Sequence, residues 1–418
     1  MASRTRRAVG VTAALLVAPL VLAACGSGGS GGSGDGDSVT IEFFQSKTES
    51  IDVVDQLIAD FEASHEGITV EQTAVPDALT VLTTRLAKND IPDVIGINVS
   101  NLNDIATAGI LADQSGTEAA AAVDNTSAQE YVDALSGGLG TVAVPWTVNA
   151  QVVLYDVDQF AELGLEVPTT WDEFIALART VKDQGAEPFS FTWKDAWTAK
   201  LVFNSIAGSL QGPDFWSELQ DGSVTFSDSP AYAETTEKLI ELTQYAQPDP
   251  FGQGYDDGNA AFADGDSVMY VQGTWAIPEI RATNPDKNIG TFVLPAGDSA
   301  DDTVLLSGPD SVLGVSNSSE HAEAAQEFVD YLMSADAQTT YSEDQFLFSV
   351  RGDVPATDEA LSALKSDWLD TGRVAMYPDS MFMGSSDLQA LVQQFLQDQD
   401  ATGFLSAVDT DYATNGVQ

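Results

Sequence analysis

Residues that commonly perform catalysis are scarce in this chain or lack the spacing that catalysis requires. The two histidines, His65 and His321, stand singly, and neither belongs to an H-E-x-x-H pattern. With 64 acidic residues, some pair of carboxylates is unavoidable, so such a pair carries no information. Asp409 and Asp411 begin like a calcium loop, but the next ligand position holds Ala413. The sequence therefore predicts no catalytic residue, no metal and no cofactor.

The seven tryptophans supply flat apolar surfaces on which a small molecule can stack. One such stack contributes about 1 to 2.5 kcal/mol, whereas a micromolar complex requires about 8 kcal/mol, so several groups must converge. Trp193 and Trp197 are four residues apart and would share one face of a helix as a clamp. Trp197 equally continues an apolar stripe that runs to Leu201, as a packing residue would. Three others lie inside helical patterns and are assigned to packing: Trp171, Trp216 and Trp368.

Short polar side chains follow two of the predicted strands, at the point where each strand ends. Gln45 and Ser46 come after the opening strand, and Asn98 and Ser100 come after the apolar run 95–97. Open α/β sheets bind ligands beyond the carboxyl ends of their strands. These four residues are therefore predicted to contact a ligand, with helix capping as the alternative for each.

Hydrophobic periodicity predicts the elements that position these residues. Alternating or continuous apolar runs predict strands at 39–43, 68–71, 91–97, 142–145, 152–155 and 268–271. Helical spacing predicts helices at 54–61, 79–86, 102–108, 171–181, 197–206, 233–245, 322–333 and 388–396. Thr170 and Glu173 can cap the helix at 171–181 reciprocally, and Gly185 ends it. The alternation of strands and helices predicts an α/β fold with mostly parallel strands.

The N-terminus carries an export signal. Arg4, Arg6 and Arg7 precede an apolar stretch, 9–24, that is shorter than the ~20 residues a membrane span needs. The stretch ends in Leu-Ala-Ala-Cys, which resembles the lipobox of bacterial lipoproteins. That resemblance implies a lipoprotein signal peptide, 1–24, cleaved before a diacylated Cys25 that anchors the protein outside the cell membrane. Residues 25–37, rich in Gly and Ser, are expected to form a flexible tether.

The charge of the chain excludes some partners. The formal net charge is −48 at pH 7. A field of this sign opposes nucleic acids and phosphate-rich substrates, so no nucleic-acid partner is expected. It says little about a neutral ligand, because a solubilising acidic surface accounts for the same charge.

After the tether, the sequence resembles the sugar-binding family, family 1, of extracellular solute-binding proteins. The resemblance covers nearly all of the mature chain. It rests on Phe-Glu-Ala-Ser-His-Glu-Gly-Ile-Thr-Val at 61–70, Val-Pro-Trp at 144–146, and the run from 163 to 174. It also rests on Phe-Ala-Asp-Gly-Asp-Ser-Val-Met at 262–269, followed by Gly-Thr-Trp at 273–275. Each motif is weak alone, but their order along the chain is difficult to obtain by chance.

This resemblance implies a two-lobed periplasmic-binding-protein-like fold of type II, with discontinuous lobes around a hinge. The chain is expected to cross between the lobes near 146–151, near 269–274 and around 333. The first lobe would then comprise 38–146 and 274–333, and the second 147–273 and 334–418. The resemblance also implies that the protein is a monomeric lipoprotein of an ABC importer and that its lobes close around the ligand. The transmembrane subunits of the permease would then recognise the closed form.

The resemblance further implies a sugar ligand, a mono- or oligosaccharide, whose C–H faces stack on aromatic rings. Trp275, directly after Gly273 and Thr274, is the leading candidate for this stack, and Trp146 lies beside another crossing. Asp310 and Tyr377 are further candidates. Relatives often carry an aromatic residue after the first strand and an acid after the third, unlike Gln45-Ser46 and Asn98 here. A polyamine or quaternary amine ligand, or a surface hydrolase, are the alternatives.

Overall fold

The computed structural model describes residues 38–75, 78–382 and 386–416. The signal peptide and tether predicted for residues 1–37 lie outside the described residues. Within the described ranges, no helix is both long enough and apolar enough to cross a membrane.

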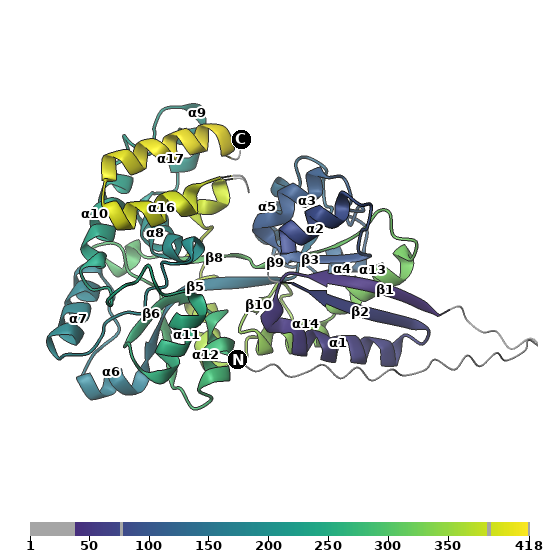
Figure 1. The fold of residues 1–418 in the computed structure, drawn as a ribbon, viewed down its shortest axis with the longest axis horizontal. Coiled ribbons are helices and arrows are strands. Elements are labelled where there is room, and N and C mark those ends of the chain that lie inside the picture. Colours follow the sequence, from purple (N-terminus) through teal and green to yellow (C-terminus); the bar gives the residue numbers. More distant parts are fainter. Residues whose placement is uncertain (1–37, 76–77, 383–385, 417–418) are drawn as a thin grey trace, which may run out of the picture. The chain divides into compact units, whose positions relative to one another are not determined.

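The first sheet has five strands in the order β2-β1-β3-β9-β4. Their bounds are Ile68–Ala74, Val39–Gln45, Val94–Asn98, Ser311–Val315 and Val144–Pro145. Figure 1 labels β1, β2, β3 and β9. β1 pairs parallel with β2 and β3, as expected for β-α-β units, while β9 pairs antiparallel with β3 and β4. Because β1 and β3 are parallel neighbours, their carboxyl ends meet at one edge of the sheet.

The second sheet is built around β5, a ten-residue strand from Thr147 to Asp156. It contains β10-β5-β8-β11, and β6 and β7 also pair with β5. The bounds of β10, β8, β11, β6 and β7 are, in that order, Phe348–Ser349, Leu305–Pro309, Val374–Ala375, Met269–Gly273 and Ile289–Phe292. All pairings of β5 are antiparallel, so the prediction of mostly parallel strands is wrong for this sheet. Periodicity identifies a strand without giving its direction, which depends on the end of the sheet to which each connection returns.

Over the described residues, the chain passes between the sheets three times: at two single residues, and through the longer segment 316–347, which joins β9 to β10 and contains the position 333 where a crossing was expected. Trp146 joins β4 to β5, as predicted, and Asp310 joins β8 to β9. The two single-residue crossings are hydrogen-bonded together, because Trp146 N donates to Ser311 O (2.8 Å) and Asp310 N donates to Thr147 O (2.9 Å). The segment 269–274, where a crossing was expected, instead contains β6, which pairs with β5 inside the second sheet. The lobe boundaries at 146/147, 273/274 and 333/334 stay predictions.

The first sheet is covered on both faces, because successive side chains of a strand point to opposite sides. Phe43 of β1 belongs to one core cluster, with Phe61 and Phe328, and Phe44 belongs to another, with Leu82. Helix α1 (Ile51–Ser64) buries the stripe that helical spacing predicts, and Gly67, which follows it, has a φ of +94°. The other helices of this part are α2 (Ala78–Leu86), α3 (Leu102–Thr107), α4 (Glu118–Ala121), α5 (Thr126–Leu135), α13 (Ala322–Leu332) and α14 (Ala335–Asp344).

Ten further helices accompany the second sheet within the described ranges. They are α6 (Val157–Leu163), α7 (Trp171–Asp183), α8 (Ala196–Leu210), α9 (Phe215–Asp221), α10 (Pro230–Thr243), α11 (Tyr255–Asp264), α12 (Ala276–Thr283), α15 (Glu359–Leu364), α16 (Leu388–Asp398) and α17 (Ala401–Asn415). Thr170 caps α7 by accepting from Glu173 N (3.3 Å), as predicted. The Glu173 carboxylate accepts from Thr169 N (2.8 Å) instead of Thr170 N, one residue earlier than a capping box requires.

Candidate ligand-binding site

The loop after β1 is organised by a buried amide. The Gln45 side chain, 1% exposed, accepts from Lys47 N (2.8 Å) and donates to Gln72 Oε1 (2.9 Å). Ser46 N donates to Gly96 O (3.0 Å), and the buried Ser46 hydroxyl has no hydrogen-bond partner among the described residues. Gln45 therefore shapes the loop, and the Ser46 hydroxyl remains available for a further hydrogen bond.

The carboxyl end of β3 lies beside this loop, as the sequence predicts. Gln45 and Gly96 are paired in the β1–β3 register, and Asn98 follows at the end of β3. The side chains of Asn98 and Ser100 are exposed at the start of a 3₁₀ turn, Val99–Asn101. Val99 N donates to Asp310 O (3.2 Å), so this edge adjoins the crossing between the sheets.

A chain of polar side chains connects this edge with the second sheet. Lys47 Nζ lies 2.6 Å from Asp310 Oδ2, and Asp310 Oδ1 accepts from Asn149 Nδ2 (3.0 Å). Asn149 Oδ1 accepts from the Tyr377 hydroxyl (2.5 Å). The structure thus brings the candidates Asp310 and Tyr377 together, but it engages their polar atoms within the protein.

Lys47 is a residue that the sequence analysis missed. Burial lowers the pKa of its ammonium group, but the Asp310 and Glu49 carboxylates outweigh burial and hold this pKa above its usual range. Burial, together with Asp379 and Asp310, raises the pKa of the Tyr377 hydroxyl. Both groups therefore keep their protons at neutral pH. The available signal was a single cation directly after Gln45-Ser46 in a chain with only 16 Lys and Arg residues.

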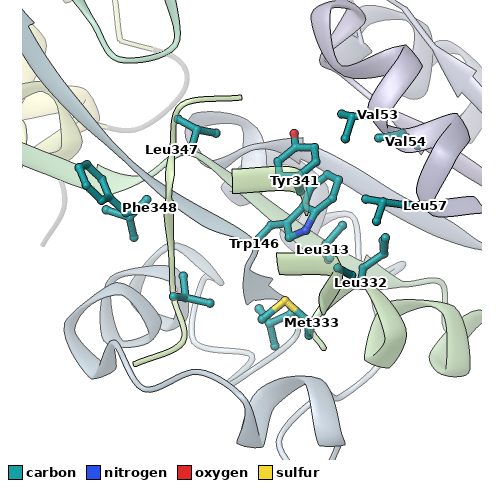
Figure 2. Packing of buried hydrophobic residues seen from close by; sticks show 14 of the residues in the cluster. Val53, Val54, Leu57, Trp146, Leu313, Leu332, Met333, Tyr341, Leu347 and Phe348 are labelled. Carbon is teal, nitrogen blue, oxygen red and sulfur yellow. The ribbon is translucent and has the colours of Figure 1, made fainter. Parts of the chain in front are cut away.

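Trp146 is packed at the crossing between the sheets. Its ring is 1% exposed and stacks on Tyr341 with centroids 3.9 Å apart, while Phe43 approaches edge-on at 6.1 Å. Figure 2 shows the indole beside Tyr341, with Leu57 and Leu313 nearby. The Trp146 carbonyl accepts from Gln338 Nε2 (3.1 Å). These contacts are those of a core residue in the described arrangement.

Trp275 has a different environment from Trp146. Its indole is partly exposed and lies directly on the backbone of β6. It occupies the N-cap position of α12 and packs against the core cluster that contains Trp146. A Cβ atom at Gly273 would lie 2.0 Å from Trp275 Cζ3, so only glycine permits this approach. Thr274 N donates to Ala150 O (2.9 Å), which fixes the turn to β5. The indole is therefore held in place with part of its surface uncovered.

Trp193 and Trp197 do not form the helical pair that their spacing allowed, because α8 begins only at Ala196. Trp193 is 2% exposed and stacks on Phe191 at 4.5 Å, inside the core of the second sheet. Trp197, in the first turn of α8, is partly exposed and lies 5.1 Å from the ring of Tyr255. The two rings therefore have separate surroundings.

Two surface cavities lie away from these residues. One, of about 160 Å³, lies between α16 and α17 and is lined in part by Phe395 and Phe404. The other, of about 380 Å³, is lined in part by Asp353 and Lys365. None of the predicted site residues lines either cavity. Among the described residues, no group of three or more His, Cys, Asp or Glu side chains could hold a metal ion.

Two mixed sheets with helices around them, joined by single-residue crossings at Trp146 and Asp310, define the class of the fold. It is the two-lobed periplasmic-binding-protein-like fold of type II, in which each lobe is built from separate stretches of chain. The SBP RafE in complex with raffinose matches it with a TM-score of 0.78 at 27% sequence identity, covering 90% of this chain and 98% of RafE. A second solved structure that is similar to this chain is the apo form of RafE from Streptococcus pneumoniae.

Sequence comparison gives the family. The family model described as "Bacterial extracellular solute-binding protein" matches residues 46–339, and this chain belongs to that family. The "Multiple sugar-binding protein" of Streptococcus mutans is 32% identical over 345 residues, which are 80% of each chain. The "Diacetylchitobiose binding protein DasA" of Streptomyces coelicolor is 27% identical over 332 residues, or 75% of each chain. The resemblance stated from sequence motifs is thus confirmed.

Proposed function

We propose that this protein captures a sugar or an oligosaccharide between its two lobes and delivers it to the permease of an ABC importer. The observation that carries the proposal is Trp275, a partly exposed indole held against Gly273 at the end of β6 in the second sheet. Such a ring can stack on the C–H face of a pyranose. The names of the relatives support the same ligand class, since they bind multiple sugars, diacetylchitobiose or raffinose.

The proposed contacts are those side chains that remain available to a ligand. Stacking is assigned first to Trp275 and then to Trp197, and hydrogen bonding to Ser46, Asn98 and Ser100. Gln45, Asp310 and Tyr377 are proposed to support the site, because their polar atoms are engaged within the protein. Trp146 and Trp193 are proposed to act from the core beneath it. The function needs no bond to be made or broken, so we propose a binding protein and not an enzyme.

A thermal-shift panel tests the ligand class. Raffinose and diacetylchitobiose represent saccharides, and betaine and spermidine represent the amines. At a concentration 100 times its Kd, a ligand that binds only the folded state stabilises it by about 2.7 kcal/mol, which raises the melting temperature by a few degrees. We expect this rise with a saccharide. A rise with an amine alone would overturn the ligand class, and chromatographic detection of saccharide cleavage would overturn the binding-only function.

We also propose that the mature protein is a monomeric lipoprotein outside the cell membrane, attached through Cys25. This rests on the Leu-Ala-Ala-Cys motif after an apolar stretch and on the family's extracellular character. Mass spectrometry of the N-terminal peptide from purified membranes should find Cys25 as the first residue, carrying acyl chains. Recovery of a peptide that contains Met1 and an unmodified Cys25 thiol would contradict this proposal.

A further inference from the structure

The contacts of Lys47, Asp310, Asn149 and Tyr377 link three parts of the fold, and we call these four residues the hinge strut. Lys47 belongs to the loop after β1 of the first sheet. Asp310 is the crossing residue, and Asn149 belongs to β5 of the second sheet. Tyr377 precedes the 3₁₀ turn Pro378–Met381, whose Asp379 carboxylate accepts from Asn204 Nδ2 of α8 (2.8 Å). The strut therefore runs from the first sheet, through the crossing, to a helix of the second.

The position of Asp310 makes the strut sensitive to the angle between the sheets. The crossings at Trp146 and Asp310 are the shortest connections between the sheets, so a rotation of one sheet against the other is expected to bend the backbone there. The Asp310 carboxylate contacts Lys47 from the first sheet and Asn149 from the second, at 2.6 and 3.0 Å. A rotation moves these partners in different directions, so one short side chain keeps both contacts only over a narrow range of angles.

The burial of the ion pair makes the loss of these contacts costly. The Lys47 and Asp310 side chains are only 10% and 7% exposed. Separating a buried pair leaves charge without compensation, which is far more unfavourable than breaking a surface pair. A second carboxylate, that of Glu49, is also within reach of Lys47, with its Oε1 3.6 Å from Nζ. Glu49 lies in the 3₁₀ turn Thr48–Ser50, which Lys47 directly precedes, so this second contact does not depend on the angle between the sheets.

We infer that the hinge strut sets the angle between the lobes in the ligand-free protein, with Lys47 as a positioning residue that exchanges Asp310 for Glu49 when the angle changes. The strut thereby regulates the proposed binding function without touching the ligand. Apparent affinity scales with the fraction of molecules in the binding-competent arrangement, so the strut tunes affinity through that fraction. The inference rests on the two-lobed fold and requires no particular sugar.

The test measures the distance between the lobes without any ligand. Exposed Glu118 of α4 and Glu162 of α6 are replaced by cysteine and spin-labelled, in a Cys25→Ser background that removes the native thiol. Lys47→Met should broaden the distance distribution about twofold or add a second population, because the preferred angle is no longer selected. Lys47→Arg, which keeps the charge, should restore the original distribution.

A second buried ion pair provides a matched control. Lys287 Nζ also lies 2.6 Å from a carboxylate oxygen, Asp156 Oδ2, and the two side chains are 6% and 9% exposed. Both residues belong to the second sheet and its connections, away from the crossing. Lys287→Met should lower the melting temperature and leave the inter-lobe distance unchanged. Should Lys47→Met not fold, Lys47→Met combined with Asp310→Asn removes both charges and still breaks the strut.

The outcomes separate positioning from stability. A broadened distribution in the Lys47 variants, but not in Lys287→Met, supports the inference. An unchanged distribution in Lys47→Met, or in the double variant, overturns it and leaves the pair with a stabilising role alone. Because no sugar is present, failure of the sugar-binding proposal would not alter this result.

Discussion

Replacing Trp275 with alanine is expected to weaken saccharide binding more than tenfold while moving the melting temperature of the ligand-free protein by only a few degrees. The indole is partly exposed and rests on Gly273, so its removal opens little of the core. On a bound pyranose it would cover about 50 to 100 Å² of apolar surface, worth about 1 to 2.5 kcal/mol. A tenfold change in Kd corresponds to about 1.4 kcal/mol. Isothermal titration calorimetry with the saccharide that shifts the melting temperature measures the effect.

Two other substitutions sharpen this experiment. Trp368 is also partly buried against the core, with Arg373 over its ring at 4.3 Å, so Trp368→Ala is a matched loss of an indole outside the proposed site. It should leave Kd unchanged. Gly273→Ala should reproduce the defect of Trp275→Ala, because the added methyl group occupies the position of the indole. Equal affinities for wild type and Trp275→Ala would show that Trp275 only packs.

The local elements of the first sheet could be predicted because their patterns are short-range. The alternation that gives β1, the stripe from Val54 to Phe61 that gives α1, and the glycine that follows it are all contained within about thirty residues. The end of α7 likewise follows from Gly185, whose φ of +84° suits glycine best. Parallel pairing of β1 with β3 then placed Gln45 and Asn98 at one edge, as predicted.

The remaining features depend on partners that are distant in the sequence. Periodicity carries no information on strand direction, and therefore the antiparallel pairings of β5 and the crossing at Asp310 were not predicted. Lys47 and Asp310 are 263 positions apart by their numbers, so no local pattern links them. The Trp193–Trp197 pair failed for a smaller reason, because a spacing of four residues has meaning only if both residues are helical. Whether a polar side chain such as that of Gln45 is free to bond a ligand also depends on tertiary contacts.

The buried indole at the first crossing should show the opposite behaviour to that of Trp275. Trp146→Ala is expected to lower the free energy of unfolding by about 3 to 5 kcal/mol, the range for removing a large aromatic side chain from a core. The reason is the loss of the stack on Tyr341 and of the edge contact with Phe43, in a place where the backbone is fixed by hydrogen bonds to the second crossing. Urea denaturation of the ligand-free protein, followed by circular dichroism, measures this change.

Trp146→Phe is the control for this prediction, because a smaller ring retains part of the stack and should recover about half of the lost stability. The folded fraction of Trp146→Ala should bind the saccharide with a smaller loss of affinity than Trp275→Ala, since the Trp146 ring is only 1% exposed. A Trp146→Ala variant of wild-type stability that loses binding would reverse the two roles. It would make the crossing indole the ligand's stacking surface, and the angle between the lobes would then have to differ enough from the described one to uncover that ring.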